Sequence, residues 1–392
     1  MCDVPALRFP EFTGEWERHK LSEVCSFYSG GTPSSSKKEY YNGNIPFIRS
    51  GELHKDYTEL FITEAGLSNS AAKLVETGDL LLALYGATSG DIAISKIKGA
   101  INQAILCIRT KQNKKFIESV WNKHVERLLQ TYLQGGQGNL SADIVKNIPF
   151  YFANSNEQDK LAKFISLLDE RIATQNKIIE KLETLIKAMC DTLVEQETQQ
   201  VTLSFSDFGQ SYLGLSGKSA EDFGEGYPFI TYMNVYQNQI IDLTDVGLVK
   251  INETEQQSVV RYGDILLTLS SETPEEVGMG AVYLGETYPL YLNSFCFGIH
   301  ITDESKIYPP FLAYYVSSQS FRKAVYPLAQ GSTRFNLQKS DFMKKKFSFP
   351  VIEKQRKIYS TLKTYSDKLI VEKQIMRLLC NQKCYLLRQL FI

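Results

Sequence analysis

Apolar residues recur every four and then three positions along two long stretches of this chain. The first stretch carries Leu161, Ile165, Leu168, Ile172, Ile179, Leu182, Ile186, Met189 and Leu193, with Gln175 as its polar exception. The second carries Ile358, Leu362, Tyr365, Leu369, Met376, Leu379, Leu386 and Leu390, with Glu372 and Lys383 as polar exceptions. A seam of this period, sustained beyond four heptads, predicts two long coiled-coil helices. At 1.5 Å per residue each would be about 60 Å long.

Charge suggests how these helices bury their seams. Residues 157–197 hold six Lys or Arg and nine Asp or Glu, a net charge of −3, whereas residues 353–392 hold nine and three, a net charge of +6. Opposite flanking charges select a partner and an orientation. We therefore expect the helices to pair with each other, antiparallel. Two independent helices in a larger bundle and a coil between two copies of the chain are the alternatives.

The chain also repeats itself. Corresponding pieces lie 182 to 197 positions apart, so the intervening loops differ in length while the framework is kept. The matched pieces are 45–48 with 227–230, 78–81 with 263–266, 139–140 with 336–337, and 158–161 with 355–358. Such internal repetition identifies a duplicated structural unit. Two similar modules with divergent contents suit a protein that reads two different things with one scaffold.

Within each module the pattern predicts an α+β fold built on a bent, mostly antiparallel sheet. Strands are expected at 45–49, 80–84, 93–94 and 104–108, and again at 265–269, 281–283 and 295–299. Helices are expected at 114–133 and 309–328. The predicted division is a first module at 1–154, a spacer helix at 155–198, a second module at 199–351 and a C-terminal spacer helix at 352–392.

Composition narrows the class of protein. The 392 residues are 43% hydrophobic with a net charge of −1, so any nucleic-acid footprint must be local. Seven Cys without a Cys-x-x-Cys pair and only four His argue against a structural zinc site. No apolar run of 18 residues and no signal peptide is present, which predicts a cytoplasmic, reduced location.

Two loops carry side chains suited to contact with DNA. Residues 134–139 (QGGQGN) combine glycines with amides, and residues 330–336 (QGSTRFN) occupy the corresponding place in the second module. Glycine lets a backbone approach a surface closely, Gln and Asn can bond adenine bidentately, and Arg suits the guanine edge. Five Lys or Arg against one Asp over 330–346 form a basic patch that could hold phosphates. The alternative is a solvated charge run.

The sequence lacks the motifs of common catalytic and metal-binding sites. Residues 44–47 (NIPF) and 147–150 (NIPF) resemble the Asn-Pro-Pro-Phe/Tyr loop of amino-methyltransferases, but Ile replaces the first proline and each copy borders a predicted strand. No phosphate-binding Gly-x-x-x-x-Gly-Lys-[Ser/Thr] loop, no His-Glu-x-x-His and no convincing nuclease cluster is found. The sequence therefore predicts neither a catalytic nor a metal site.

The order of motifs resembles the specificity subunits of Type I restriction–modification systems. The likeness rests on 7–12 (LRFPEF) with Trp16, 30–34 (GGTPS) leading into 41–47 (YNGNIPF), 167–172 (LLDERI) and 331–337 (GSTRFNL). It covers essentially the whole chain. The second module departs from it, because 213–218 (LGLSGK) stands where the first has Gly-Gly-Thr-Pro-Ser.

The resemblance implies two target-recognition domains that each read half of a split double-stranded DNA sequence. It also implies that the paired helices dock two methyltransferase subunits, with restriction or translocase subunits as further candidates. S-adenosylmethionine, ATP and magnesium would belong to those partners, and this chain would hold no cofactor. The implied DNA contacts are Thr32, Ser34, Ser35, Lys37, Lys38, Arg49, Ser50, Tyr85, Gln134, Gln137, Asn139, Ser216, Lys218, Tyr232, Asn234, Ser332, Thr333, Arg334, Asn336 and Lys339. A coiled-coil scaffold with generic binding heads, or a fused methyltransferase or nuclease, are the other classes considered.

Overall fold

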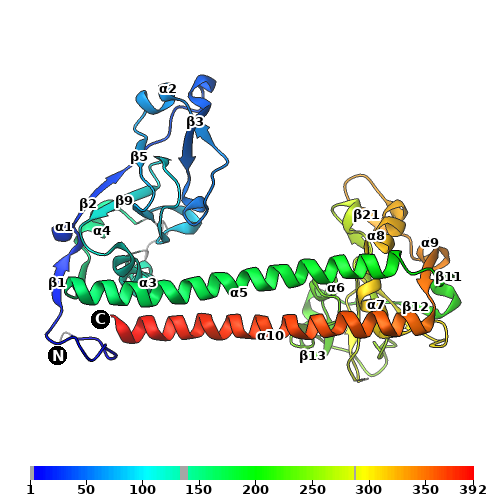
Figure 1. The fold of residues 1–392 in the computed structure, drawn as a ribbon. Helices are drawn as coiled ribbons and strands as arrows, with labels where there is room; N and C mark the ends of the chain where they lie inside the picture. Colours follow the sequence, from blue (N-terminus) through cyan, green and yellow to red (C-terminus); the bar gives the residue numbers. More distant parts are fainter. Residues whose placement is uncertain (1–3, 133–139, 287) are drawn as a thin grey trace. The chain divides into compact units, whose positions relative to one another are not determined.

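The computed structural model describes residues 4–132, 140–286 and 288–392, and it divides into two compact units (Figure 1). The first unit contains Met1–Asn176 and Gln374–Ile392, and the second contains Lys177–Lys373. Each unit therefore combines one module with part of both long helices.

The first unit is built on small, mostly antiparallel sheets. Its central sheet has the strand order β2 (Cys25–Ser29), β9 (Ile105–Thr110), β6 (Leu80–Ala83), β7 (Ile92–Ile94). A second sheet has the order β4 (Phe61–Ile62), β3 (Tyr41–Ile48), β8 (Gly99–Ile101), β5 (Lys73–Val75), in which β3 and β8 are parallel. β1 (Glu17–Lys20) pairs with β10 (Pro149–Phe152). The helices are α1 (Leu21–Val24), α2 (Glu64–Ser68), α3 (Lys114–Tyr132) and α4 (Ala142–Asn147).

The second unit repeats this topology. Its central sheet has the order β12 (Gly209–Leu213), β19 (Cys296–Ile301), β15 (Ile265–Thr268), β17 (Gly280–Val282). β14 (Val246–Val249), β13 (Phe223–Ile230) and β18 (Tyr291–Leu292) form a second sheet, and β11 (Gln200–Ser204) pairs with β22 (Lys346–Pro350). A further small sheet has the order β16 (Ser270–Ser271), β21 (Phe335–Leu337), β20 (Ala329–Gln330). The helices are α6 (Tyr232–Gln237), α7 (Pro309–Tyr315), α8 (Gln319–Val325) and α9 (Lys339–Lys344).

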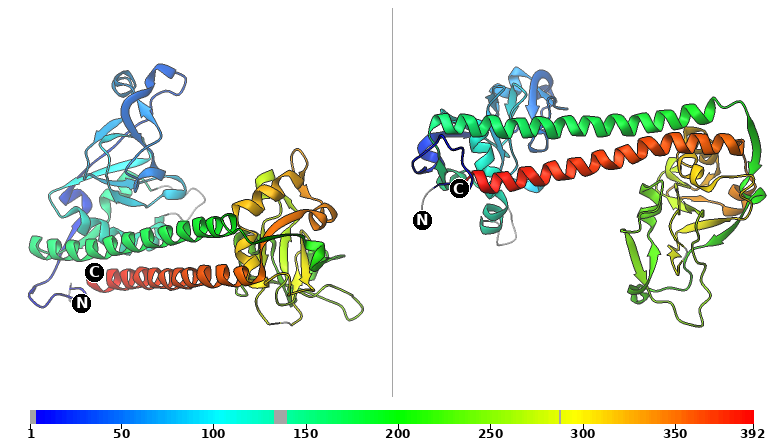
Figure 2. Two further views of the ribbon diagram at one scale, coloured as in Figure 1. Left: turned by 45° about the vertical axis from the view of Figure 1, so that its right-hand side comes forward. Right: turned by 60° about the horizontal axis from the view of Figure 1, so that its bottom comes forward.

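The predicted spacer helices are α5 (Ser155–Glu195) and α10 (Ile352–Leu390). In the first unit Leu161 and Ile165 share an apolar cluster with Leu387 and Leu390. The last turns of α10, drawn red, lie beside the first turns of α5 in all three views (Figures 1 and 2). Lys383 also pairs with Asp169 at 2.5 Å.

The same pairing holds in the second unit. There Ile186 and Cys190 of α5 share a cluster with Ile358 and Leu362 of α10, and Lys373 pairs with Glu183 at 2.7 Å. In both units later residues of one helix meet earlier residues of the other. The predicted antiparallel pairing within the chain is therefore confirmed.

A buried glutamine performs the same task at the start of each long helix. The Gln158 carboxamide accepts from the backbone N–H of Asn113 (3.1 Å), just before α3, and donates to the carbonyl of Ala153 (2.7 Å). Gln355 accepts from the N–H of Tyr308 (2.8 Å), just before α7, and donates to the carbonyl of Pro350 (2.8 Å). These bonds satisfy backbone groups that the ends of helices and strands leave without partners.

Gly30 and Gly214 keep one structural feature of a motif that otherwise differs between the modules. A Cβ on Gly30 would lie 1.8 Å from the carbonyl oxygen of Ile101, and a Cβ on Gly214 would lie 2.0 Å from that of Asn293. Both positions therefore require glycine because the backbones approach closely. The close approach is kept in the second module although the surrounding motif is not.

The structure confirms the α+β class and most predicted elements, and it corrects two details. The strands of each module belong to several small sheets rather than one bent sheet. The helix predicted at 309–328 is broken, because Ser318 caps a new helix, α8, by accepting from the N–H of Phe321. The four-part domain division stays a prediction.

Candidate nucleic-acid interface

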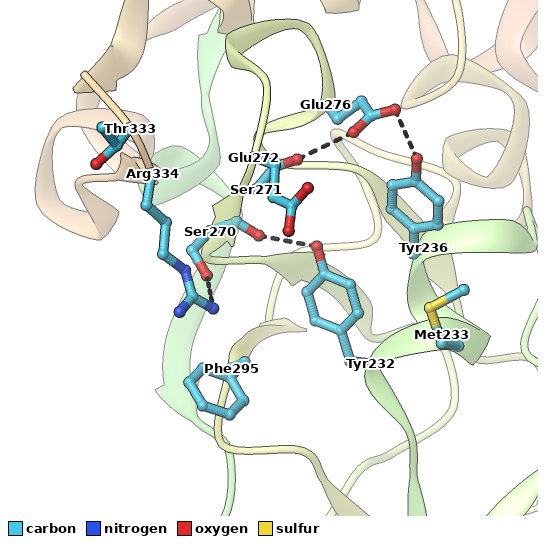
Figure 3. A pocket seen from close by; sticks show the side chains of 10 residues that line it. All are labelled: Tyr232, Met233, Tyr236, Ser270, Ser271, Glu272, Glu276, Phe295, Thr333 and Arg334. Atoms are coloured by element: carbon cyan, nitrogen blue, oxygen red, sulfur yellow. Dashed lines mark hydrogen bonds between the residues drawn. The ribbon is translucent and has the colours of Figure 1, made fainter. Parts of the chain in front are cut away.

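The second unit contains a pocket of about 810 Å³ at the loop that precedes β21 (Figure 3). The loop is positioned by backbone pairing of β16 with β21, which sets Ser270 opposite Asn336. The N–H of Leu337 donates to the carbonyl of Leu269 (2.8 Å) and fixes the register. The side chains that line the pocket are Tyr232, Met233, Tyr236, Ser270, Ser271, Glu272, Glu276, Phe295, Thr333 and Arg334.

Arg334 is held on one wall of this pocket. Its Nη2 donates to the Ser270 hydroxyl at 3.3 Å, and its guanidinium lies 5.6 Å from the centre of the exposed Phe295 ring. Stacking on an aromatic face limits the orientations of the guanidinium plane while leaving its other donors accessible. The arrangement can present several N–H groups to a planar acceptor such as a guanine edge.

Two tyrosines from α6 form the opposite wall. Their rings stack with centroids 6.0 Å apart and planes 16° from parallel. The Tyr232 hydroxyl donates to the carbonyl of Ser270 (2.8 Å), and the Tyr236 hydroxyl donates to Glu276 (2.7 Å). The bond to Glu276 raises the pKa of Tyr236, and it lowers the pKa of the Glu276 carboxyl. These bonds fix both tyrosine hydroxyls and favour the ionised form of Glu276.

The structure brings several predicted residues of the second module together. Tyr232, Thr333 and Arg334 line the pocket, and Ser332 and Asn336 are exposed on the same loop and strand. Lys339 begins α9 directly afterwards and is partly exposed. Their contacts with DNA stay predictions, but their placement on one surface fits a common ligand.

Two predicted contacts in the second module are structural instead. Asn234 is wrong as a base contact, because it is 0% exposed and its amide donates to the carbonyls of Asp242 (2.7 Å) and Asp245 (2.6 Å). The Lys218 ammonium pairs with Glu255 at 2.5 Å, and its side chain is only 4% exposed. The nearby Ser216 is exposed, but its backbone N–H and C=O both bond the Gln257 amide.

In the first unit the predicted loop at 32–38 is exposed apart from Pro33. Thr32 donates to Gln103 (2.6 Å), and Lys37 donates to the hydroxyl of Tyr40 (3.0 Å). Ser34, Ser35 and Lys38 are exposed on the same loop, and Tyr85 is 38% exposed in the loop after β6. The predicted contacts Gln134, Gln137 and Asn139 lie outside the described residues.

Arg49 and Ser50 follow β3, where a buried carboxylate organises the backbone. Glu52, 3% exposed, accepts from the Arg49 guanidinium (2.8 Å) and from the Thr58 hydroxyl (3.0 Å). Arg49 also donates to Glu59 (2.8 Å), and these bonds raise the pKa of Arg49. Because two carboxylates already neutralise its charge, Arg49 is better explained as a support for this turn than as a free contact for DNA.

The sequence did not single out several residues of the pocket. Glu272, Glu276, Tyr236, Met233 and Phe295 all line it. Phe295 belongs to a stretch that reads as a buried strand, yet it precedes β19 and is 54% exposed. The repeat does not locate Glu272, because the offset between the modules changes from 185 at β6 and β15 to 188 at β7 and β17.

The described part of the chain contains neither a metal-binding cluster nor a membrane-spanning helix. Across residues 4–132, 140–286 and 288–392, no group of three or more His, Cys, Asp or Glu is arranged to hold a metal ion. None of the helices within those ranges is both long and apolar enough to cross a bilayer.

Comparisons with known proteins agree with the duplicated architecture. The chain is 23% identical to the MjaVIII Type I restriction enzyme specificity subunit of Methanocaldococcus jannaschii, over 95% of this chain and 90% of that protein. Its fold is similar to the crystal structure of the S subunit of a Type I restriction–modification system from M. genitalium, with a TM-score of 0.56, 16% identity and 99% of both chains covered.

A second similar structure comes from a study of complex assembly and conformational transition in the Type I system, with a TM-score of 0.59 at 14% identity and coverage of 95% and 96%. The sequence model described as "Type I restriction modification DNA specificity domain" matches this chain twice, at residues 13–184 and 214–379. These matches span far more than half of the chain, which therefore belongs to the Type I restriction–modification DNA specificity family.

Proposed function

We propose that this chain reads a split, asymmetric DNA target and directs methyltransferase and restriction subunits to it. Membership in the family makes it a non-catalytic specificity component. The observation that carries the finer proposal is the duplicated framework with different exposed chemistry. The first module presents Thr32 and Tyr85, whereas the second presents Glu272 and Arg334. Different side chains on one scaffold select different base edges, so the two half-sites should differ.

The basic surface beside the pocket supports DNA as the ligand. Residues 330–346 contain five Lys or Arg and one Asp, in a chain whose net charge is −1, and of these cations Lys346 is paired with Asp207 at 2.8 Å. Local cations hold phosphates and fix the register, while side chains such as Arg334 contribute base selectivity. A generic coiled-coil scaffold would not require these loops at corresponding places, so it is the weaker candidate.

Exposed apolar side chains support two docking sites for partner subunits, one in each unit. In the first unit Leu167, Leu378 and Tyr385 are 55%, 66% and 57% exposed. In the second unit Ile178, Leu185 and Val371 are 37%, 42% and 51% exposed. Each of these six residues directly precedes a seam position, so they form stripes turned about 100° away from the seam. Exposed apolar stripes on helices mark interaction surfaces.

In this proposal two methyltransferase subunits bind these stripes, and they supply the cofactor chemistry. S-adenosylmethionine would be bound by the methyltransferase subunits, and ATP and magnesium by restriction subunits. A partner enzyme must also take the target base out of the duplex before methylating it. This chain would only choose where that happens.

Sequencing of methylated DNA tests the function directly. Host DNA with and without this chain, expressed with its methyltransferase partner, should differ by one split motif with two unlike halves. A continuous or palindromic motif would contradict the proposal. For the docking sites, Leu378→Asp should reduce the bound methyltransferase from two subunits to one by native mass spectrometry. The control for added charge is Cys380→Asp, because Cys380 is exposed and lies about 200° around α10 from Leu378, outside the stripe.

A further inference from the structure

The pocket of the second unit contains a cation and an anion that do not pair with each other. Arg334 comes from the loop before β21, and Glu272 comes directly after β16 (Figure 3). Arg334 is already oriented by Ser270 and Phe295. Among the residues that the structure describes, the Glu272 carboxylate has neither a hydrogen bond nor an ion pair.

The second acid of the pocket is different. Glu276 accepts from the hydroxyls of Tyr236 (2.7 Å) and Ser271 (3.1 Å), so both of its oxygens have partners within the protein. Glu276 therefore has a structural task, holding the tyrosine wall against β16. Glu272 has no such task, and its exposed carboxylate remains available to a ligand.

An unpaired carboxylate is unexpected on a surface that meets DNA. Duplex DNA carries one negative charge for about every 1.7 Å of its axis, so an acid beside it repels the phosphates. The exception is a carboxylate that accepts a hydrogen bond from a base, and the N4 amino group of cytosine is the partner that Glu fits. Arg fits the O6 and N7 atoms of guanine. In the major groove these acceptors and that donor lie side by side on one G·C pair.

We infer that Glu272 and Arg334 together read one G·C base pair in the second half-site. The inference rests on the proposed function, because it takes this pocket to face DNA. Arg334 donates to the guanine edge and Glu272 accepts from the cytosine amino group. Ser270 and Phe295 orient the Arg334 guanidinium before DNA binds, and the stacked Tyr232 and Tyr236 form another wall of the same pocket. A preorganised frame lowers the cost of ordering side chains on binding.

The sequence of the first module differs from this pair, because the offset of 197 that matches 139–140 with 336–337 places Gln137 opposite Arg334. The offset between the modules also changes from 185 at β6 and β15 to 188 at β7 and β17, so the segment that contains Glu272 is three residues longer than its counterpart in the first module. The double readout should therefore act on one half-site only. A general effect of charge would instead change both half-sites.

The test compares methylation by complexes assembled from the full chain and its methyltransferase partner. The variants are Glu272→Ala, Arg334→Ala and the double variant. Wild type should require G·C at one position of the second half-site. Each single variant should raise methylation of the other base pairs there by about 10- to 100-fold relative to G·C. The double variant should relax that same position and no other.

Glu272→Gln tests whether the side chain at this position selects the base pair. A glutamine amide can bond adenine bidentately, so this variant should gain an A·T pair at the relaxed position. Glu275→Gln is the matched control, because Glu275 is exposed, lies three residues further along and does not line the pocket. It removes the same charge and should leave the motif unchanged.

Three outcomes would overturn the inference. The Glu272 variants could keep the wild-type discrimination, they could relax a different position from Arg334→Ala, or the shared position could be A·T in wild type. A wild-type complex that produces no split motif would instead contradict the proposed function. Matching thermal unfolding of wild type and the Glu272 variants would show that folding is not the cause of any change.

Discussion

The two modules form the same hydrogen bonds to their buried backbone groups, but they expose different side chains. Gln158 and Gln355 bond equivalent backbone groups before α3 and α7. The N–H of Leu140 donates to the carbonyl of Leu84, as that of Leu337 donates to Leu269. Buried polar groups without partners are costly, so these contacts are hard to change. Exposed side chains carry no such cost.

The segments that follow β6 and β15 show the other half of the comparison. The first module has the exposed Tyr85 and Ala87 there, whereas the second has the buried Ser270 and the exposed Glu272. A tyrosine and a methyl group offer flat and apolar contact, whereas the serine orients Arg334 beside a free carboxylate. The scaffold therefore fixes where chemistry is presented without fixing which chemistry it is.

Shifting the phase of the helices that both modules share should have the largest effect. Inserting two residues after Glu180 turns the following seam by about 200°. The apolar residues of α5 would then leave α10, and we expect assembly with the methyltransferase to be lost. Co-purification of the two subunits measures their assembly. An assembled, active complex would contradict the expected loss.

Inserting four residues at the same place is the matched control. It turns the seam by only about 40° and lengthens α5 by about 6 Å. With 3.4 Å per base pair, the gap between the half-sites should grow by about one or two base pairs while both halves stay the same. Methylation at the original spacing would show that the helices do not set the distance.

The corresponding glutamines Gln158 and Gln355 should contribute equally to the stability of their own modules. Replacing Gln158 or Gln355 by Ala leaves a buried N–H and a buried C=O without a partner, at about 1–3 kcal/mol each. We expect the free energy of unfolding to fall by about 2–6 kcal/mol in either case. Both tryptophans, Trp16 and Trp121, belong to the first unit, so their fluorescence reports Gln158→Ala, while circular dichroism reports both variants.

Exposed Gln382 on α10 provides the control for the glutamine variants. Gln382→Ala should change stability by less than about 0.5 kcal/mol, as is usual for surface substitutions. Unequal losses for Gln158→Ala and Gln355→Ala would break the equivalence of the two modules.

Arg334→Ala should have a smaller effect, confined to DNA recognition. If Arg334 reads a base edge, binding to the cognate duplex weakens by about 1–3 kcal/mol and one position of the second half-site relaxes. If it holds only a phosphate, all duplexes weaken alike and the salt slope falls by about one. Fluorescence anisotropy of the assembled complex at several salt concentrations separates these results. Unchanged binding would exclude both roles.

The sequence predicted the parts of the fold that depend on periodic burial. The seams of α5 and α10 repeat every 3.5 residues on average, and their pairing follows from opposite flank charges. The strands β6 and β15 read as apolar runs after a Gly-Asp turn. These elements are local or strongly patterned, so little outside them decides their structure.

The candidate site depended on contacts that no local pattern contains. Asn234 resembled a base-reading amide, but tertiary packing gives it the carbonyls of Asp242 and Asp245. Glu272 reads as an ordinary surface acid until β16 pairs with β21 and brings it to the pocket of Arg334. The polarity of a side chain is visible in a sequence, whereas the identity of its partner is not.

The smallest expected difference between the modules is their response to acid. Glu52 in the first and Asn234 in the second occupy corresponding, buried positions after β3 and β13. Burial alone would raise the pKa of Glu52, but hydrogen bonds from Arg49 and Thr58 lower it from 4.5 to about 2. A depressed carboxyl pKa stabilises the folded state above the unfolded value, and that contribution is lost as the pH falls from about 4.5 to 2. Asparagine has no such titration.

The fluorescence of Trp16 and Trp121 can follow this loss in the first unit alone. The urea midpoint of wild type should fall between pH 4.5 and pH 2, and Glu52→Gln, less stable at neutral pH, should reduce that fall. Glu59→Gln is the control, because it removes the exposed carboxylate that shares Arg49 with Glu52 but leaves the buried one in place. If Glu52→Gln and wild type lose stability in parallel, the buried carboxylate does not control the acid response. The two modules would then be equivalent in this respect as well, despite the different residues at the corresponding position.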